Sequence, residues 1–132
     1  MTCSVCAIAV VLVVACGVNK TVPLRPLATG TFDRYKIEAC ASGGHVVKLT
    51  YEPDERGEHR SKELVEKYRD RYLLPALKDA VDVKGWSYDS TCGRSGLTLR
   101  VPSAAAGEAL HRIGATLHKN PTDIEVTVVG AK

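Results

Sequence analysis

The side chains best suited to covalent chemistry are those of Cys40 and His45, on either side of the glycine-containing turn 41–44. A thiol beside an imidazole is the usual arrangement of a cysteine nucleophile, because the imidazole takes up the thiol proton. No third side chain near this turn is recognisable as a group that would orient the imidazole. One hypothesis is therefore a small secreted hydrolase or thiol enzyme that uses Cys40 and His45. The alternative gives both residues structural roles.

Two further histidines, His111 and His118, lie seven residues apart in a segment that is predicted to be helical. This spacing places them on one side of the helix, about 10 Å apart along its axis. A shared metal ion needs ligands one turn apart, as in the H-E-x-x-H pattern. We therefore expect two histidines at the edge of the solvent, no metal site and no cofactor.

The segment 53–60 is a charged loop, and its charged side chains include Asp54, Glu55, Arg56, Glu58 and Arg60. The acidic spacing does not match a calcium-binding loop, and the interleaved arginines disfavour a bound cation. We expect a solvated loop, which is the best candidate surface for a protein partner.

Charge and composition exclude several classes of function. The net charge is +3, and no cluster of five basic residues occurs, so nucleic-acid binding is not expected. Phosphate-binding glycine loops and heptad arrays are also missing from the sequence. The composition, 45% hydrophobic and 25% charged, is that of an ordinary globular domain.

The residues around these candidates predict an α+β fold. Apolar and polar side chains alternate in 34–40 and 45–52, and again in 81–90 and 97–101, which predicts two hairpins. A last strand is expected around 124–128.

Two helices are predicted between these strands. In the first, Ser61 is the expected N-cap, and Pro75 either kinks the helix or starts a second short one. Its apolar stripe consists of Leu64, Val65, Tyr68 and Tyr72, continued by Leu77, Ala80 and Val81. In the second helix Ser103 is the expected N-cap, and the apolar stripe consists of Ala106, Leu110, Ile113 and Leu117. Gly107 and Gly114 would allow that helix to pack closely on the sheet.

The element order is ββα-ββα-β, which favours a mostly antiparallel sheet with both helices on one face. In both hairpins a cysteine, Cys40 or Cys92, opens a glycine-containing turn. An internal duplication of a ββα unit is therefore a further hypothesis.

The first 19 residues contain no charged side chain, and residues 6–18 are almost wholly apolar. Such a run is too short for a membrane-spanning helix, which needs about 20 residues, and matches a secretory signal. Its end, Val13-Val14-Ala15-Cys16, resembles the lipobox of bacterial lipoproteins. The resemblance covers only these N-terminal residues and implies cleavage before Cys16 and acylation of Cys16. Because Gly17 replaces the aspartate that retains such proteins at the inner membrane in many enteric bacteria, it also implies an outer-membrane anchor facing the periplasm.

These observations divide the chain into a signal peptide (1–15), a lipid-anchored tether (16–30) and one α+β domain (31–132). The tether is inferred from Pro23, Pro26 and the surrounding small residues; a terminal strand and loop is the alternative. With Cys3 and Cys6 removed and Cys16 acylated, Cys40 and Cys92 remain. In an oxidising compartment they are expected to form a disulfide.

The sequence therefore favours a small non-enzymatic envelope lipoprotein. It would be attached to the membrane by the acyl chains on Cys16 and would bind another envelope protein, as an assembly accessory or as an immunity-type inhibitor. The alternatives are the thiol enzyme described above and a periplasmic small-ligand binder.

Overall fold

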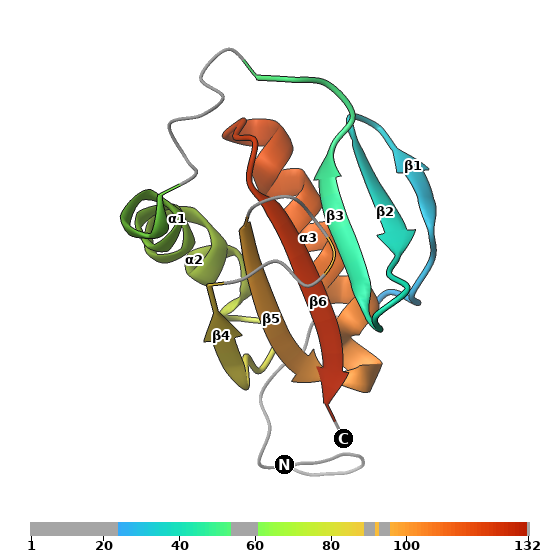
Figure 1. The fold of residues 1–132 in the computed structure, drawn as a ribbon. Coiled ribbons are helices and arrows are strands. Elements are labelled where there is room, and N and C mark those ends of the chain that lie inside the picture. The colour runs from blue at the N-terminus through green and yellow to red at the C-terminus, as the bar shows by residue number, and fades with distance from the viewer. Residues whose placement is uncertain (1–23, 54–60, 89–91, 93–95, 132) are drawn as a thin grey trace, which may run out of the picture.

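A computed structural model describes residues 24–53, 61–88, 92 and 96–131, and shows one sheet with helices packed against it (Figure 1). Its described strands follow the order β1-β2-β3-β6-β5-β4. Their bounds are β1 (Gly30–Phe32), β2 (Tyr35–Ala39), β3 (His45–Leu49), β4 (Gly85–Ser87), β5 (Gly96–Pro102) and β6 (Glu125–Ala131). All neighbouring pairs are antiparallel except β5 and β6. The predicted α+β class is confirmed.

Both hairpins form. Three of their strands, β2, β3 and β4, are shorter than the alternation predicts, and β5 is longer by one residue at each end. Strand β3 ends at Leu49 and β4 covers only Gly85–Ser87, while residues 89 and 90 lie outside the described part of the chain. The short edge strand β1 was not predicted. It pairs with β2 after a turn at Asp33, which adopts a positive φ of 57°. Aspartate tolerates this conformation better than most residues, which permits so tight a turn.

One parallel pair interrupts the antiparallel sheet, and helix α3 (Ala106–Lys119) explains it. A parallel connection must cross from one end of the sheet to the other, which takes about a dozen residues or more. The 14 residues of α3 provide this crossing between β5 and β6. Leu97, Leu99 and Val101 of β5 point towards the helices and are at most 1% exposed, as their alternation predicts.

The first helical region begins as predicted and then departs from a regular helix. Ser61 caps α1 (Lys62–Tyr68), since its Oγ accepts the Leu64 N–H at 3.2 Å. A π-helical turn (Arg69–Leu73) follows, and α2 (Leu74–Leu77) carries Pro75 in its first turn. A π-turn inserts an extra residue and rotates the following side chains. As a result Leu73 is fully buried where the predicted stripe placed Tyr72. Leu64, which precedes this turn and was also assigned to the stripe, is 36% exposed.

Helix α3 packs on the sheet through the predicted apolar stripe, and it ends at Asn120 as expected. The predicted cap is wrong. Ser103 begins a 3-10 turn (Ser103–Ala105), and its hydroxyl reaches the Ala131 carbonyl at 3.5 Å. The residue at the N-cap of α3 is Ala105, which has no capping side chain.

Gly114 provides the close approach between α3 and the sheet that the sequence suggested. A Cβ built at Gly114 would lie 2.2 Å from Cδ2 of Tyr35 on β2, well inside van der Waals contact. The ring of Tyr35 therefore lies flat against the bare helix backbone. Sheet and helix meet here at a distance that only glycine allows.

We expect Gly114→Ala to lower the free energy of unfolding by about 1–3 kcal/mol through overpacking. On an exposed helix the same change would raise the free energy of unfolding by about 1 kcal/mol. The sign of the measured change therefore shows whether Gly114 is tightly packed. Urea unfolding would measure it. In a Tyr35→Ala background the added methyl group has room, so Gly114→Ala should no longer lower the free energy of unfolding. An equal loss in both backgrounds would contradict the contact with Tyr35.

The segment that precedes β1, which belongs to the predicted tether, is packed against the domain. Residues 24–29, here called the strap, run along the start of α3 rather than free of the domain. A Cβ at Gly107 would lie 2.5 Å from the Arg25 carbonyl oxygen, so the strap backbone lies directly on this glycine. Gly107 thus allows close packing of the strap, where the sequence suggested packing on the sheet. The folded part of the chain begins before residue 31.

The two hairpins are arranged symmetrically around β6, as the order β2-β3-β6-β5-β4 shows. Strands β3 and β5 run in opposite directions, because β6 is antiparallel to the first and parallel to the second. A two-fold axis normal to the sheet would relate such hairpins. Duplication of a ββα unit would give this topology, but it stays a prediction. Superposition of residues 35–77 on 85–119 would test it.

Candidate functional site

Cys40 and Cys92 form a disulfide with a Cα–Cα distance of 5.6 Å, as the cysteine count predicts. The two cysteines do not belong to neighbouring strands of the sheet. Cys40 follows β2 and Cys92 lies between β4 and β5, and both β3 and β6 separate these elements in the sheet. The bond therefore connects the two halves of the sheet across its centre.

This disulfide contains the sulfur atom that would make Cys40 a candidate nucleophile. A thiol is needed for nucleophilic attack, and the sulfur of Cys40 is already bonded to that of Cys92. His45 lies at the start of β3, half-buried, opposite Ala39 of β2. In the oxidised protein these two residues therefore lack the free thiol that the enzyme hypothesis requires.

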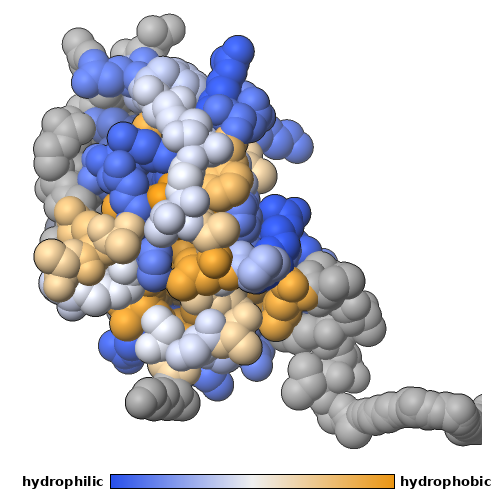
Figure 2. Space-filling model, turned by 90° about the vertical axis from the view of Figure 1, so that its right-hand side faces the viewer, coloured by the Kyte–Doolittle hydropathy of each residue, from blue (hydrophilic) through white to orange (hydrophobic). Residues whose placement is uncertain are grey.

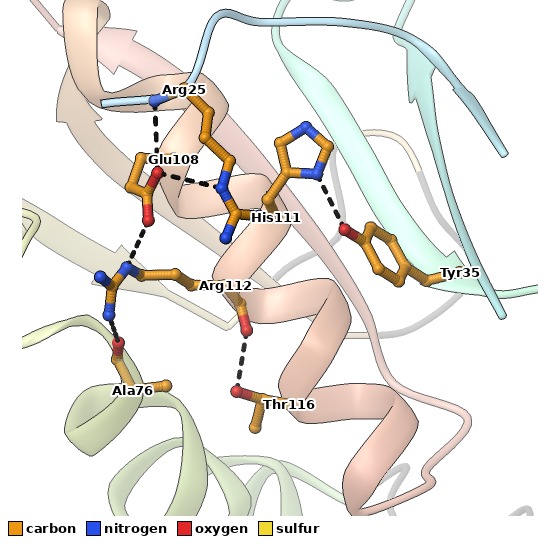
Figure 3. Close-up of polar contacts among 7 residues, drawn as sticks. All are labelled: Arg25, Tyr35, Ala76, Glu108, His111, Arg112 and Thr116. Atoms are coloured by element: carbon orange, nitrogen blue, oxygen red, sulfur yellow. Dashed lines mark hydrogen bonds and ion pairs between the residues drawn. The ribbon is translucent and has the colours of Figure 1, made fainter. Parts of the chain in front are cut away.

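A polar cluster lies at the start of α3 and is centred on the buried Glu108, which is only 1% exposed (Figure 3). One carboxylate oxygen accepts the Arg25 backbone N–H at 3.2 Å and lies 3.5 Å from the Arg25 Nε. The other accepts the Arg112 Nε–H at 2.5 Å. Arg112 also donates to the Ala76 carbonyl oxygen at 3.1 Å. The cluster therefore holds the strap, α2 and α3 together.

Next to this cluster, His111 is hydrogen-bonded through Nδ1 to the Tyr35 hydroxyl at 2.8 Å (Figure 3). The Phe32 ring meets the imidazole edge-on, with 4.7 Å between ring centroids. His111 is 8% exposed, so the prediction of a solvent-edge histidine is wrong for this residue. It sits beside Leu110 on the buried side because β1 and β2 cover that side of α3. His118 is partly exposed, and its Nε2 lies 3.7 Å from the Asp33 carboxylate.

Sequence reasoning missed both Glu108 and the Tyr35–His111 pair. The spacing of Glu108 and Arg112, four residues apart, was an available signal for a helical ion pair. No local sequence pattern indicates the contact of Arg25 with Glu108 or that of Tyr35 with His111. Arg25 is 83 residues from Glu108, and Tyr35 is 76 residues from His111.

The environment of His111 predicts a loss of stability in acid. Burial lowers the pKa of His111 below its ordinary value of 6.5, and the nearby Arg25 guanidinium lowers it further, against the opposing effect of Glu108. The unfolded chain then binds a proton at a higher pH than the folded one. His111 therefore favours folding fully above pH 6.5, and this contribution is lost as the pH falls towards the lowered pKa.

We expect the free energy of unfolding to fall between about pH 7.5 and about pH 5, and less steeply in a His111→Gln variant. Denaturant unfolding at both pH values would measure the difference. Equal slopes in the two proteins would contradict the prediction.

A pocket of about 240 Å³, here called the β3–β6 pocket, opens where β3 ends and β6 begins. Its lining includes Lys36, Lys48, Tyr51, Glu52, Asp123 and Glu125. Tyr51 is 36% exposed, and the Arg34 guanidinium lies 5.8 Å from its ring centroid. Tyrosine and arginine are enriched in protein interfaces, and the rim of an interface is polar. Pro53, which also lines the pocket, directly precedes the charged loop.

A second hollow, an apolar groove of about 430 Å³, lies beside the π-helical turn and includes Leu74, Pro75, Val81 and Val83 in its lining. The Arg69 side chain, on the same turn, stacks 5.8 Å from the Trp86 ring centroid. The groove holds few polar groups that could orient a ligand.

Several predicted site residues cannot be placed, since Cys16 and the loop residues Asp54, Glu55, Arg56, Glu58 and Arg60 lie outside the described residues. Within the described ranges, no three His, Cys, Asp or Glu side chains are grouped as metal ligands would be. None of the described helices has the length and hydrophobicity to cross a bilayer. Comparison with protein-family models, curated proteins and solved structures finds no match to this chain.

Proposed function

We propose that this protein is a non-enzymatic envelope lipoprotein whose disulfide-bonded domain binds another envelope protein. The observation that carries the proposal is the Cys40–Cys92 disulfide, because such bonds persist in oxidising compartments. It supports the export that the lipobox-like residues Val13–Cys16 imply. Acyl chains on Cys16 attach the protein to the membrane, and an outer-membrane anchor follows from Gly17.

The intact mass of the protein, extracted from membranes without reduction, tests the anchor and the compartment together. The proposal expects residues 16–132 plus acyl chains, with the mass of two hydrogens missing for the disulfide. A mass that matches all 132 residues with free thiols would contradict it and would restore a free Cys40 thiol beside His45.

The β3–β6 pocket is the surface that we assign to the partner. The charged residues 54–60, which follow Pro53 in the sequence, stay the predicted partner-binding residues. Support comes from the exposed Tyr51 and the mixed charges around it. Aromatic side chains with a polar surrounding provide most of the binding energy in many protein interfaces. An assembly accessory and an immunity-type inhibitor would both use such a surface.

We expect Tyr51→Ala to reduce the amount of partner recovered by crosslinking in membranes about tenfold, the usual effect of removing an interface aromatic. Tyr88→Ala is the matched control, because Tyr88 is 38% exposed, similar to Tyr51 at 36%, but directly follows the edge strand β4. Equal recovery with both variants would exclude the β3–β6 pocket as the partner surface.

The apolar groove beside the π-helical turn favours a second candidate function, the binding of a small apolar ligand in the periplasm. A thermal-shift screen with small apolar molecules tests it. A ligand at 100 times its dissociation constant adds about 2.7 kcal/mol to the stability of the protein. Val83→Asp in the groove should abolish any such shift.

A further inference from the structure

Two leucines of the strap are the most exposed large hydrophobic residues that the structure describes. Leu24 and Leu27 are each 45% exposed, compared with 36–38% for Tyr51, Leu64 and Tyr88. They are three residues apart on one short segment. Figure 2 shows that hydrophobic surface gathers in the lower part of this side of the molecule, the height at which α3 begins in Figure 1. Neighbouring exposed leucines indicate an apolar contact outside the domain.

The strap cannot turn these leucines inward without breaking its contacts with α3. The Arg25 backbone N–H, between the two leucines, is bonded to the buried Glu108 carboxylate (Figure 3). The strap backbone also lies directly on Gly107. The direction in which Leu24 and Leu27 face is therefore fixed relative to the whole domain.

Chain length keeps the strap close to the proposed lipid anchor. Residues 17–23 separate Cys16 from Leu24. Even a fully extended chain of eight residue steps spans at most about 28 Å. A flexible chain of this length averages about 16 Å between its ends. If Cys16 is acylated, the two exposed leucines lie within reach of the membrane surface.

The charges of this region fit an anionic lipid surface. Lys20 and Arg25 are the charged residues between Cys16 and Phe32, and the first acidic residue after Cys16 is Asp33. The Arg25 side chain is 55% exposed although its Nε lies 3.5 Å from Glu108. Basic residues near a membrane surface are attracted to anionic headgroups, while leucines insert between headgroups and acyl chains.

We propose, building on the proposed lipid anchor, that the strap is a membrane-seating surface. Leu24 and Leu27 enter the boundary between headgroups and acyl chains, and Arg25 contacts anionic headgroups. The end of the domain at which α3 begins then faces the membrane. Helix α3 has 14 residues and is about 21 Å long. The β3–β6 pocket, at its other end, therefore faces away from the membrane and is open to a partner (Figure 1).

Quenching of an introduced tryptophan tests this orientation. Trp86, the one tryptophan of the chain, is first replaced by phenylalanine. Leu27→Trp then reports on the strap, and Leu64→Trp, on α1, is the control on an exposed leucine elsewhere. The acylated mature protein is reconstituted into vesicles of phosphatidylcholine and phosphatidylglycerol whose acyl chains carry bromine, which quenches tryptophan on contact.

If the strap contacts the membrane, quenching should be several-fold stronger in Leu27→Trp than in Leu64→Trp. The difference should be smaller in vesicles of phosphatidylcholine alone, which lack anionic headgroups. Equal or no quenching in protein that floats with the vesicles would overturn the seating but leave the lipid anchor intact. Protein that does not float with the vesicles would overturn the anchor, and the seating with it.

Discussion

Replacing both Cys40 and Cys92 by serine is expected to lower the free energy of unfolding by about 4 kcal/mol. The two residues are 52 positions apart, so the bond closes a long loop and restricts the unfolded chain strongly. The bond also joins turns that belong to opposite halves of the sheet. Because domains of this size are stable by about 5–15 kcal/mol, the loss is a large fraction of the total.

Denaturant unfolding of the oxidised protein, the reduced protein and the double serine variant measures this contribution. The reduced protein and the serine variant should be destabilised equally, and a reductant should have no further effect on the variant. That last comparison is the control for effects of the reductant on other parts of the chain. Reduction that leaves the unfolding midpoint unchanged would show that the bond contributes nothing to stability.

Glu108→Ala is expected to cost about 3 kcal/mol, the second largest effect. The Glu108 side chain is 2% exposed and is the common partner of Arg25 and Arg112. Removing it leaves the Arg25 N–H without its acceptor and the Arg112 side chain, which is 26% exposed, without its ion pair. Breaking a buried pair from one side costs more than the pair contributes, because the remaining group stays poorly solvated.

Glu38→Ala is the matched control for this substitution. Glu38 also has two basic partners, Lys36 at 3.3 Å and Lys48 at 3.5 Å, but its side chain is 47% exposed. Exposed pairs contribute at most about 1 kcal/mol, so Glu38→Ala should have little effect. Hydrogen exchange gives a local test, since the Arg25 amide should exchange faster in Glu108→Ala. Equal destabilisation by both substitutions would contradict the special role of the buried carboxylate.

The sequence by itself determined the elements that depend on local patterns. Alternation of apolar and polar side chains located β2, β3 and β5, because successive strand residues face opposite sides of a sheet. The period of the apolar stripe and the Asn120-Pro121 pair located α3 and its end. Ser61 marked the start of α1 through a contact that spans three residues. Counting cysteines identified Cys40 and Cys92 as partners.

The tertiary structure alone decided which polar groups are buried and which strands are neighbours. Glu108 and His111 look like ordinary polar residues of an amphipathic helix, and they are buried only because the strap and the β1–β2 hairpin cover that side of α3. The parallel pairing of β5 with β6 and the rotation of the π-helical turn that buries Leu73 likewise follow from packing. Local sequence records the preferences of a residue and its near neighbours, whereas these features depend on contacts between residues far apart in the chain, which form only when the whole domain folds.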